Sequence, residues 1–403
     1  MTVTPSDIER AHEAIRPHVV HTPTVPAPRL GEPLGTDLWL KLENLQYTGS
    51  FKDRGSCYKL TALANQTTPP PGVIAASAGN HAQGVAHHAS RLGLPATIVM
   101  PLTTPFAKVE RTEGHGAEVV LHGESLAESA DHALEIADAR GLTFVHPYDD
   151  PHIVAGQGTT ARELLDDQPE IDTLVVPIGG GGLCAGMAVW AKHIKPGIRI
   201  FGVQTEGCPS MHAALQGQPM PRPNTHTIAD GIAVKMPGKL PIELLRDRLD
   251  DVLLVSETDL EEAVQLLASQ QKLVAEGAGA AGYAALLRHA QLFENRKVAA
   301  VLCGGNIDRR LLSTVLLRGL KRDGKIAKLI VPIHDVPGVL SRVTQLIGGA
   351  GADVVDIEHH RLFNDVAPRE AELHVTMETR GAEHVQRIVF RLQEAGYQAV
   401  SVG

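Results

Sequence analysis

The sequence predicts an α/β protein built on doubly wound parallel sheets, followed by a smaller α+β domain. Apolar runs alternate with helical patterns over three quarters of the chain, and aromatic residues make up only 3% of it, so small aliphatic side chains must fill the interior. The order of elements then changes after a charged linker at residues 321–325. Since 403 residues are too many for one ordinary core, two or three structural units are expected.

Six apolar runs are typical of buried parallel strands, and each is followed by a helical stretch. Motifs rich in small residues come directly after three of these runs: SAGNH, GGGGL and CGGN. Because sites in open sheets lie at the carboxyl ends of strands, we expect the three motifs to share one cleft. The predicted strands are residues 73–76, 96–100, 119–121, 174–178, 198–203 and 298–302.

Composition and charge exclude several classes of partner. The net charge of -9 and the pI of about 6.1 argue against nucleic acid or an anionic membrane surface as the main partner. No stretch has the length and apolarity of a membrane span, so we expect a cytoplasmic protein. The cysteines form no CxxC pair, which disfavours a zinc site and a disulfide framework. His87-His88 and His359-His360 lack partners at ligand spacing, so we expect no metal.

Lys52, in the run SFKDRG at residues 50–55, is the most informative residue. A lysine beside an aromatic residue at the start of a helix can be desolvated enough to act as an amine nucleophile. In isolation the run would equally describe a surface lysine. Its occurrence together with SAGNHAQG at 77–84, GGGGL at 179–183 and CGGN at 303–306 favours the functional interpretation.

The four segments, in this order, resemble the serine/threonine dehydratase family of pyridoxal-phosphate enzymes. The resemblance extends from about the first helix to about residue 322. It implies two open-sheet subdomains around a central cleft (fold type II, tryptophan synthase β-like), in a catalytic domain of residues 1–322 with a smaller subdomain inserted at about 45–150. It also implies pyridoxal 5'-phosphate as cofactor and Lys52 as both its Schiff-base residue and the base that removes the substrate's Cα proton.

The glycine run offers backbone N–H groups that no side chain blocks, at the start of a predicted helix. Glycine runs also occur in plain turns, and this one fits neither a Walker motif nor a dinucleotide fingerprint. By resemblance, the cofactor phosphate is held by Gly179, Gly180, Gly181, Gly182 and the amide of Leu183. Further cofactor contacts are expected at Phe51, Asn80, Cys303, Gly231 and Glu276. Gly231 and Glu276 could equally be helix-terminal structure.

The segment SAGNH feeds a helix N-terminus, where exposed amides and the Ser77 hydroxyl could bind a carboxylate. Ordinary N-capping by Ser77 or Asn80 is the structural alternative. By resemblance, Asn80 meets the phenolic oxygen of the cofactor, and Ser77 joins Lys52 as a catalytic residue. The same resemblance implies that the substrate carboxylate is bound by Ser77, Gly79, Asn80 and His81.

Two positions favour one reaction over others. Cys303 is expected to face the pyridine nitrogen of the cofactor. A thiol keeps this nitrogen less protonated than a carboxylate would, which suits elimination. The alternative is a cysteine that is simply buried in the core. Ala78 stands where racemases of this family have a serine, and alanine cannot move a proton. The resemblance therefore implies dehydration of L-threonine to 2-oxobutanoate and ammonia, and of L-serine to pyruvate. One alternative is a dehydratase that prefers L-serine or 3-hydroxyaspartate. Another is a non-catalytic protein that senses amino acids.

The last 81 residues, 323–403, form a separate pattern of strand 327–333, helix from 335, strands 352–363 and 371–378, helix 383–395 and strand 398–402. This βαββαβ order is typical of a ferredoxin-like sandwich. The turn DVPGVL resembles an ACT domain, which implies allosteric regulation in amino-acid metabolism such as isoleucine biosynthesis, and a homo-oligomer (dimer or tetramer). An amino-acid effector would meet Asp335, Gly338, Val339 and Leu340, and passive dimerisation is the alternative.

Overall fold

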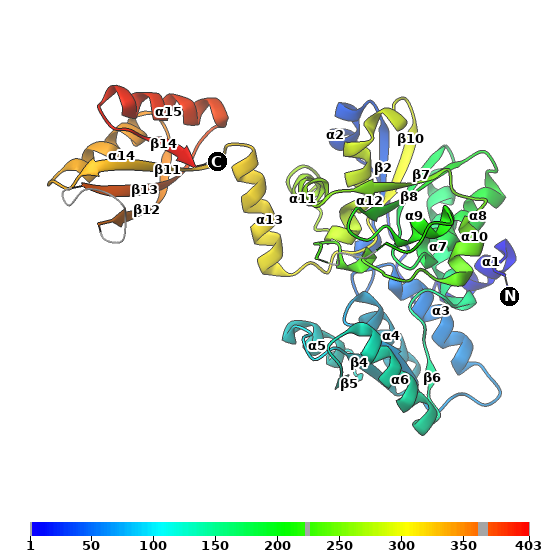
Figure 1. Ribbon diagram of the computed structural model, residues 1–403. Coiled ribbons are helices and arrows are strands. Elements are labelled where there is room, and N and C mark those ends of the chain that lie inside the picture. The colour runs from blue at the N-terminus through cyan, green and yellow to red at the C-terminus, as the bar shows by residue number, and fades with distance from the viewer. Residues whose placement is uncertain (1, 222–225, 362–369, 403) are drawn as a thin grey trace. The chain divides into compact units, whose positions relative to one another are not determined.

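The computed structural model describes residues 2–221, 226–361 and 370–402. The chain divides into two compact units, Met1–Ile307 and Asp308–Gly403, whose elements are labelled in Figure 1. The second unit opens with helix α13 (Arg309–Arg322). The boundary that we expected, after residue 322, lies at the far end of this helix.

The larger sheet of the first unit has six strands in the order β1-β2-β10-β7-β8-β9. Neighbouring strands run parallel, except that β1 is antiparallel to β2. Every residue of β7 is buried, as its unbroken apolar sequence predicts. The strands are β1 (Thr24–Pro26), β2 (Asp37–Lys41), β7 (Thr173–Pro177), β8 (Arg199–Thr205), β9 (Asp251–Val255) and β10 (Lys297–Val301).

Helices of the first unit pack against this sheet and against one another. Their start signals are clear in the sequence: Thr4 caps the first helix in a capping box with Asp7, and the Asp150 side chain caps a helix that has proline at its first position. The helices are α1 (Pro5–Ile15), α2 (Pro28–Gly31), α7 (Pro151–Asp167), α8 (Gly182–Ile194), α9 (Ser210–Leu215), α10 (Lys239–Leu245), α11 (Glu257–Leu266) and α12 (Gly277–Arg288), with short turns η2 (Glu43–Leu45) and η3 (Asp230–Ile232).

A second, smaller sheet lies within the first unit and has four parallel strands in the order β5-β4-β3-β6. Three alanines of α4, Ala82, Ala86 and Ala89, are buried in its core, where their small side chains allow close packing against the apolar strands. The elements are α3 (Lys52–Ala64), β3 (Val73–Ala76), α4 (Asn80–Leu92), β4 (Ala96–Met100), α5 (Phe106–Glu113), β5 (Glu118–Leu121), α6 (Leu126–Arg140) and β6 (Thr143–Phe144). Two parallel-sheet subdomains confirm the predicted fold class.

The second unit has an antiparallel sheet in the order β12-β13-β11-β14, which confirms the predicted βαββαβ arrangement. Burial alternates along β13, because one face of the sheet packs its apolar side chains beneath the helices. The elements are β11 (Ile326–His334), α14 (Val339–Gly349), β12 (Asp353–His360), β13 (Glu370–Glu378), α15 (Ala382–Glu394) and β14 (Val400–Val402). The end of the predicted strand 352–363 lies outside the described residues.

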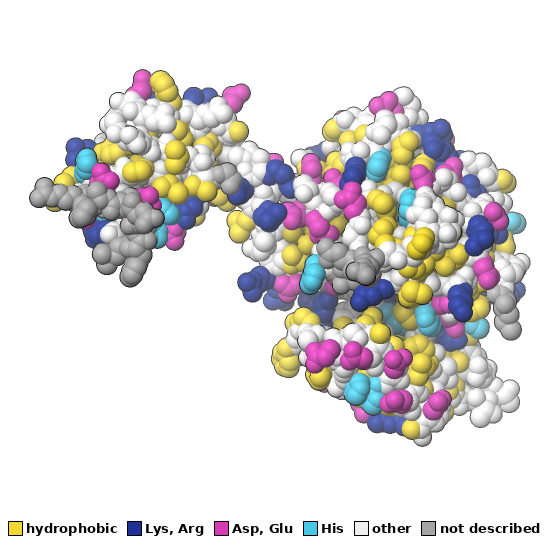
Figure 2. Space-filling model, in the orientation of Figure 1, with side chains coloured by type: hydrophobic (Ala, Val, Ile, Leu, Met, Phe, Trp, Pro, Cys, Tyr) yellow, Lys and Arg dark blue, Asp and Glu magenta, His cyan; other side chains and the backbone are white. Residues whose placement is uncertain are grey.

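Every helix in the described ranges is too short or too polar to cross a lipid bilayer. Hydrophobic side chains do reach the surface of the second unit, as Figure 2 shows in yellow. Those exposed on its strands include Val355 on β12, and Val400 and Val402 on β14.

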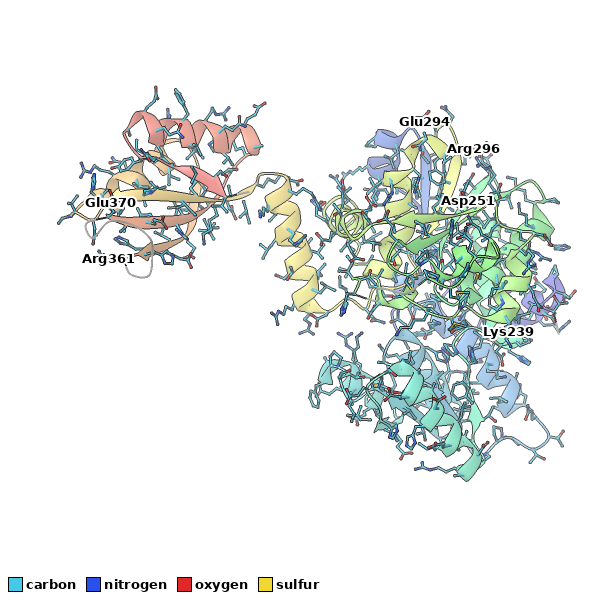
Figure 3. The ribbon with its side chains drawn as sticks, in the orientation of Figure 1. Lys239, Asp251, Glu294, Arg296, Arg361 and Glu370 are labelled. Atoms are coloured by element: carbon cyan, nitrogen blue, oxygen red, sulfur yellow. The ribbon has the colours of Figure 1, made fainter. Side chains whose placement is uncertain are left out.

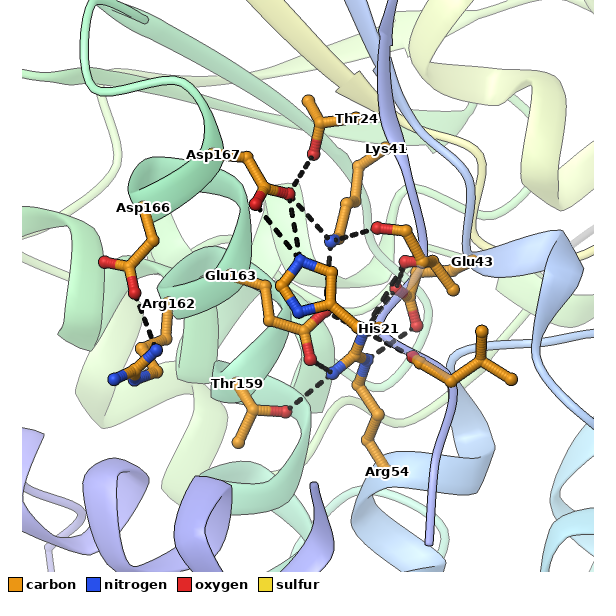
Figure 4. A network of polar contacts seen from close by, with 12 residues as sticks. His21, Thr24, Lys41, Glu43, Arg54, Thr159, Arg162, Glu163, Asp166 and Asp167 are labelled. Carbon is orange, nitrogen blue, oxygen red and sulfur yellow. Dashed lines mark hydrogen bonds and ion pairs between the residues drawn. The ribbon is translucent and has the colours of Figure 1, made fainter. Parts of the chain in front are cut away.

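A buried network of charges joins three segments of the first unit (Figure 4). The Arg54 guanidinium, in α3, donates to both oxygens of Glu43 (2.7 and 2.8 Å) and to both oxygens of Glu163 (2.8 and 2.6 Å). Lys41, at the end of β2, donates to Glu163 (3.0 Å) and to the Thr22 carbonyl (2.7 Å). The network is shielded from solvent, since Arg54, Glu43 and Lys41 are all 0% exposed.

Charge pairing overcomes the desolvation of this network. Burial alone would raise the pKa of the Glu163 carboxyl, but the positive charges of Arg54 and Lys41 outweigh it and lower that pKa to about 2. Removing one partner would therefore leave the others as buried charges without compensation, which is among the costliest changes to a protein interior.

We expect Arg54→Met to lower the free energy of unfolding by about 3–5 kcal/mol, because two carboxylates would lose their shared cation. The matched control is Arg162→Met, whose guanidinium bonds to Glu9 (3.1 Å) and Asp166 (2.6 Å) at the surface. That change should cost less than about 1 kcal/mol. The urea midpoint, followed by circular dichroism, measures both, and equal midpoints would contradict the importance of the buried network.

Candidate active site

The Lys52 amine lies in a desolvated setting at the first residue of α3. Its Nζ donates to the carbonyl of Pro147 (2.8 Å) and lies 5.2 Å from the centroid of the Phe51 ring. Burial lowers the pKa of this amine from 10.5 to about 8, against the opposing effect of the nearby Cys303 and Glu276. A lysine in this state is partly neutral near physiological pH, and the neutral amine is the nucleophilic and basic form.

Backbone pairing places Lys52 beside the CGGN segment. The amide of Phe51 donates to the carbonyl of Cys303 (3.0 Å), and the amide of Gly305 donates to the carbonyl of Gly49 (2.9 Å). Ser50 also forms a β-bridge with Gly304. The segment before the lysine therefore lies along the segment that leaves β10.

A chain of amide and carboxyl side chains links four loops at this point. Asn306 Nδ2 donates to the carbonyl of Thr48 and to Asn80 Oδ1, both at 2.7 Å, and Asn80 Nδ2 donates to Glu276 Oε1 at 2.7 Å. Burial, with a contribution from Asp230, raises the pKa of the Glu276 carboxyl to about 7. Asn80 and Glu276 were predicted site residues, whereas Asn306 stood in a predicted motif without an assigned role.

The glycine run turns the chain from β7 into α8. Gly181 has φ +99°, and a Cβ on Gly180 would lie 2.2 Å from the ring of Tyr148. A Cβ on Gly179 would lie 2.9 Å from the carbonyl oxygen of Gly231. Glycine is thus required for packing, and the run brings Gly231 of η3 into the site.

The same turn is suited to an anion. The first amides of α8, including those of Gly182 and Leu183, have no partner within the helix, and they lie at its positive end. Backbone amides at such a position bind phosphate groups. The run therefore fits the phosphate of a cofactor, while the amine of Lys52 fits its aldehyde.

Cys303 is buried, with its thiol 3.3 Å from the carbonyl of Ala278. Burial raises the pKa of this thiol well above its usual value, and the negative charge of Glu276 acts in the same direction. The thiol therefore stays protonated and is a weak donor. It lies close enough to Lys52 for a charge on either group to affect the pKa of the other.

The SAGNH segment forms the turn between β3 and α4. The helix begins at Asn80 after Gly79, and no side chain caps it, so the alternative of N-capping by Ser77 or Asn80 does not hold. Ser77 Oγ accepts from the amide of Gly79 (3.2 Å), and nothing lies within 4 Å of a Cβ placed on Gly79. This open space adjoins the hydroxyl and the first amides of the helix.

His81 differs from its neighbours because its ring is buried in the smaller subdomain. Its Nε2 donates to the carbonyl of Val145 (2.9 Å), and burial, with the positive charge of Lys52, lowers the pKa of the imidazole to about 3. The ring is therefore neutral, and its hydrogen bond turns Nε2 toward the segment after β6.

Sequence reasoning missed the segment 146–148, which touches both Lys52 and the glycine run. His146 Nδ1 accepts from the amides of Tyr148 (3.3 Å) and Asp149 (2.8 Å), and the Tyr148 hydroxyl donates to the carbonyl of Met236 (2.8 Å). The segment follows β6, a strand of only two residues, so no apolar run marked it. The only feature of the sequence that could have indicated this segment is its histidine, tyrosine and aspartate residues just before a helix.

Comparisons with known proteins agree with this geometry. Residues 15–304 match the family described as pyridoxal-phosphate dependent enzyme. The chain is 40% identical over 402 residues to an L-threonine ammonia-lyase of Thermotoga maritima, covering 100% of both chains, and 43% identical over 391 residues to one of Geobacter sulfurreducens, covering 97% of both. The crystal structure of the T.th. threonine deaminase superposes with a TM-score of 0.72 at 38% identity, over 76% of this chain and 99% of that one.

This chain belongs to the pyridoxal-phosphate-dependent enzymes. Its cofactor is pyridoxal phosphate, as predicted, and it has the fold of this family in its first unit. The match to the full-length L-threonine ammonia-lyases includes the second unit, because it extends over the whole chain.

The pKa of Lys52 predicts a pH dependence for cofactor uptake. Because the folded protein lowers this pKa, the amine becomes neutral as pH rises through about 8, rather than through 10.5. We expect the rate at which cofactor-free protein takes up pyridoxal phosphate to rise with a midpoint near pH 8, followed by the imine absorbance band.

The control for this measurement is Lys59→Arg, in the same helix, where the lysine is paired with Asp150 at 2.6 Å. That variant should keep the midpoint, and Lys52→Ala should form no band. A midpoint near 10 in the unaltered protein would show that the amine is exposed to solvent.

Proposed function

We propose that this protein is an L-threonine ammonia-lyase, which converts L-threonine to 2-oxobutanoate and ammonia and also accepts L-serine, giving pyruvate. The observation that supports the proposal most is the desolvated Lys52 amine beside Cys303, in the same site as a helix N-terminus suited to phosphate. The relatives that match the chain over its whole length are named L-threonine ammonia-lyases.

Bound pyridoxal phosphate supplies an electron sink that makes the Cα–H of an attached amino acid acidic. The residues of this chain then have distinct tasks. Lys52 Nζ accepts the Cα proton, because its lowered pKa makes the amine a base near neutral pH. Cys303 would hold the pyridine side of the cofactor ring, and its protonated thiol would leave the ring nitrogen less protonated than a carboxylate would, which suits loss of a β-hydroxyl group over reactions that need a stronger electron sink.

The substrate carboxylate is proposed to bind at the turn before α4. Ser77 Oγ and the first amides of the helix lie beside the open space at Gly79, and the helix dipole favours an anion there. The hydrogen-bonded chain from Asn306 through Asn80 to Glu276 would orient the amide of Asn80 toward the cofactor's phenolic oxygen. The β-hydroxyl would leave as water, taking up one proton to balance the proton removed from Cα. The released enamine would tautomerise to an imine, which water hydrolyses to the 2-oxo acid and ammonia.

Ala78 is proposed to restrict the reaction to elimination. Racemisation requires a second acid to return a proton to the opposite face of Cα, and a methyl side chain cannot supply one. Ala78 instead packs against the hydrophobic core of the smaller subdomain.

We expect purified protein supplied with cofactor to form 2-oxobutanoate from L-threonine, and Lys52→Ala to reduce kcat at least about 1,000-fold because the base is lost. A keto-acid assay measures the product, and chiral chromatography should find no D-allo-threonine, the epimer of L-threonine at the α-carbon. Lys59→Arg again serves as the control and should remain active. Faster turnover of L-serine or 3-hydroxyaspartate, or no keto acid at all, would contradict the proposal.

We further propose that the second unit is an ACT domain with an amino-acid effector. If the protein acts in isoleucine biosynthesis, a branched-chain amino acid is the effector to test first. Support comes from the turn before α14, where Gly338 has φ +87° and the helix amides of Val339 and Leu340 begin. Asp335 lies beside this turn and accepts from Arg361 (2.9 and 3.3 Å). The first amides of the helix are suited to the carboxylate of an amino acid.

We expect L-isoleucine or L-valine to change the KM for L-threonine, and Gly338→Ala to abolish the response because alanine is strained at a positive φ. Gly348→Ala, in the same helix, should respond like the unaltered protein, because nothing lies within 4 Å of a Cβ placed on Gly348. Initial rates with and without each amino acid measure this. A response that persists in Gly338→Ala would place the effector elsewhere.

The protein is also proposed to act in the cytoplasm as a homo-oligomer. The outer strands β12 and β14 of the second sheet carry the exposed side chains Val355, Val400 and Val402, and exposed apolar strand edges favour pairing between chains. A monomer in sedimentation velocity would contradict this part of the proposal.

A further inference from the structure

Two histidines and two glutamates form a compact array on one face of the second sheet. Strand β12 pairs with β13 so that Glu358 lies opposite His374, and His360 lies opposite Glu372. Residues two apart on a strand point to the same face, so all four side chains share it. The alternate residues of β13, Leu373 and Val375, lie in the core beneath the helices, so the array occupies the opposite face.

The side chains in this array approach as metal ligands do. One ligand atom from each of Glu358, His360 and His374 lies within 4.8 Å of the others, and the rings of the two histidines have centroids 4.4 Å apart. Glu358 Oε2 is 3.7 Å from His360 Nε2 and 3.8 Å from His374 Nδ1. His374 Nε2 lies 3.3 Å from Glu372 Oε2.

One nitrogen of the array is poorly satisfied. His360 Nε2 is shielded from solvent and has no hydrogen-bond partner among the residues that the structure describes. A shielded ring nitrogen that faces a carboxylate and a second imidazole is placed for coordination rather than for hydration. Histidine and acidic side chains lie side by side at the surface of this unit (Figure 2). Figure 3 labels Arg361, the residue after His360, and Glu370, the first residue of β13.

We propose that Glu358, His360 and His374 form a binding site for a divalent transition metal, for which Zn²⁺ is the best match. Imidazole nitrogen with carboxylate oxygen is a common zinc ligand set, and three protein ligands leave a position for Glu372 or water. The array contains no thiolate and is not an all-oxygen set, which disfavours Cu⁺ and the hard ions Mg²⁺ and Ca²⁺. In the described parts of the chain, no other trio of such side chains meets this spacing.

A competing cation is present beside the site. Lys328, on β11, donates to Glu358 Oε2 at 2.7 Å and would repel a metal ion held by the same carboxylate. A bound metal ion must therefore compete with Lys328 for the carboxylate of Glu358, or bind the second oxygen of that carboxylate. Replacing Lys328 with an uncharged residue of similar length should consequently strengthen metal binding.

The proposed metal ligands lie on β12 and β13, whereas the proposed effector turn precedes α14. Arg361, the residue after His360, bonds to Asp335 of that turn, and the predicted catalytic residues belong to the first unit. A metal ion on β12 and β13 would cross-link two neighbouring strands and stabilise this sheet by mass action. This effect requires no change in catalysis.

The test uses full-length protein with its cofactor, freed of metal by a chelator and then equilibrated with zinc sulfate. Elemental analysis after equilibrium dialysis should find about one zinc ion per chain. His360→Ala with His374→Ala should weaken binding at least about 100-fold, and Glu358→Gln should weaken it while leaving the sheet unchanged by circular dichroism. Cobalt substitution should give visible d–d bands that the double variant lacks.

His132→Ala is the matched control, because His132 stacks on His122 and bonds to Glu135 (2.9 Å) in the first unit. It should retain full binding, and Lys328→Met should bind more tightly. Equal zinc binding by the double variant would overturn the proposal, as would a full-length protein that takes up no zinc.

Discussion

The burial of Arg54 constrains the arrangement of the whole first unit. Its guanidinium is bonded to Glu43, just after β2, and to Glu163, in α7, at sites with almost no solvent. If these segments separated, a buried charge would be left unpaired. The free-energy cost would exceed that of breaking a typical ion pair at the surface. Arg54 is two residues from Lys52 in α3, and α7 begins just after the segment that contacts both Lys52 and the glycine run. The pairing therefore helps to hold Lys52 in place relative to the glycine run.

Desolvation also sets the chemistry of the site. The same exclusion of water that makes the Arg54 pairs necessary lowers the pKa of Lys52 to about 8 and raises that of Glu276 to about 7. Both groups therefore titrate near neutral pH, while the Cys303 thiol stays protonated. A site with one base, one carboxyl that titrates near neutral pH and one neutral thiol is suited to removing a Cα proton and losing a β-substituent.

The second unit uses the two faces of one sheet differently. Its inner face packs against helices, and the turn that begins α14 offers amides for a carboxylate. Its outer face carries imidazole and carboxylate groups that converge through strand pairing. A small-molecule effector and a metal ion would therefore bias the same sheet from different positions. The two proposed sites use different side chains, so each can be tested by its own substitutions.

The sequence by itself determined the fold class, because strand-sized apolar runs and the motifs that follow them are local patterns. It indicated the lysine, the glycine run and the turn before α4 for the same reason. It did not indicate β2, because the charged residues at both ends of this strand interrupt its apolar pattern. It also did not indicate β6, because a strand of two residues is too short to form such a pattern. Tertiary structure alone decided that Asn306 links Asn80 to Thr48, that Arg54 is buried between two carboxylates, and that His360 meets His374. These contacts join residues distant in the chain, and their energies depend on burial and strand register, which no local pattern encodes.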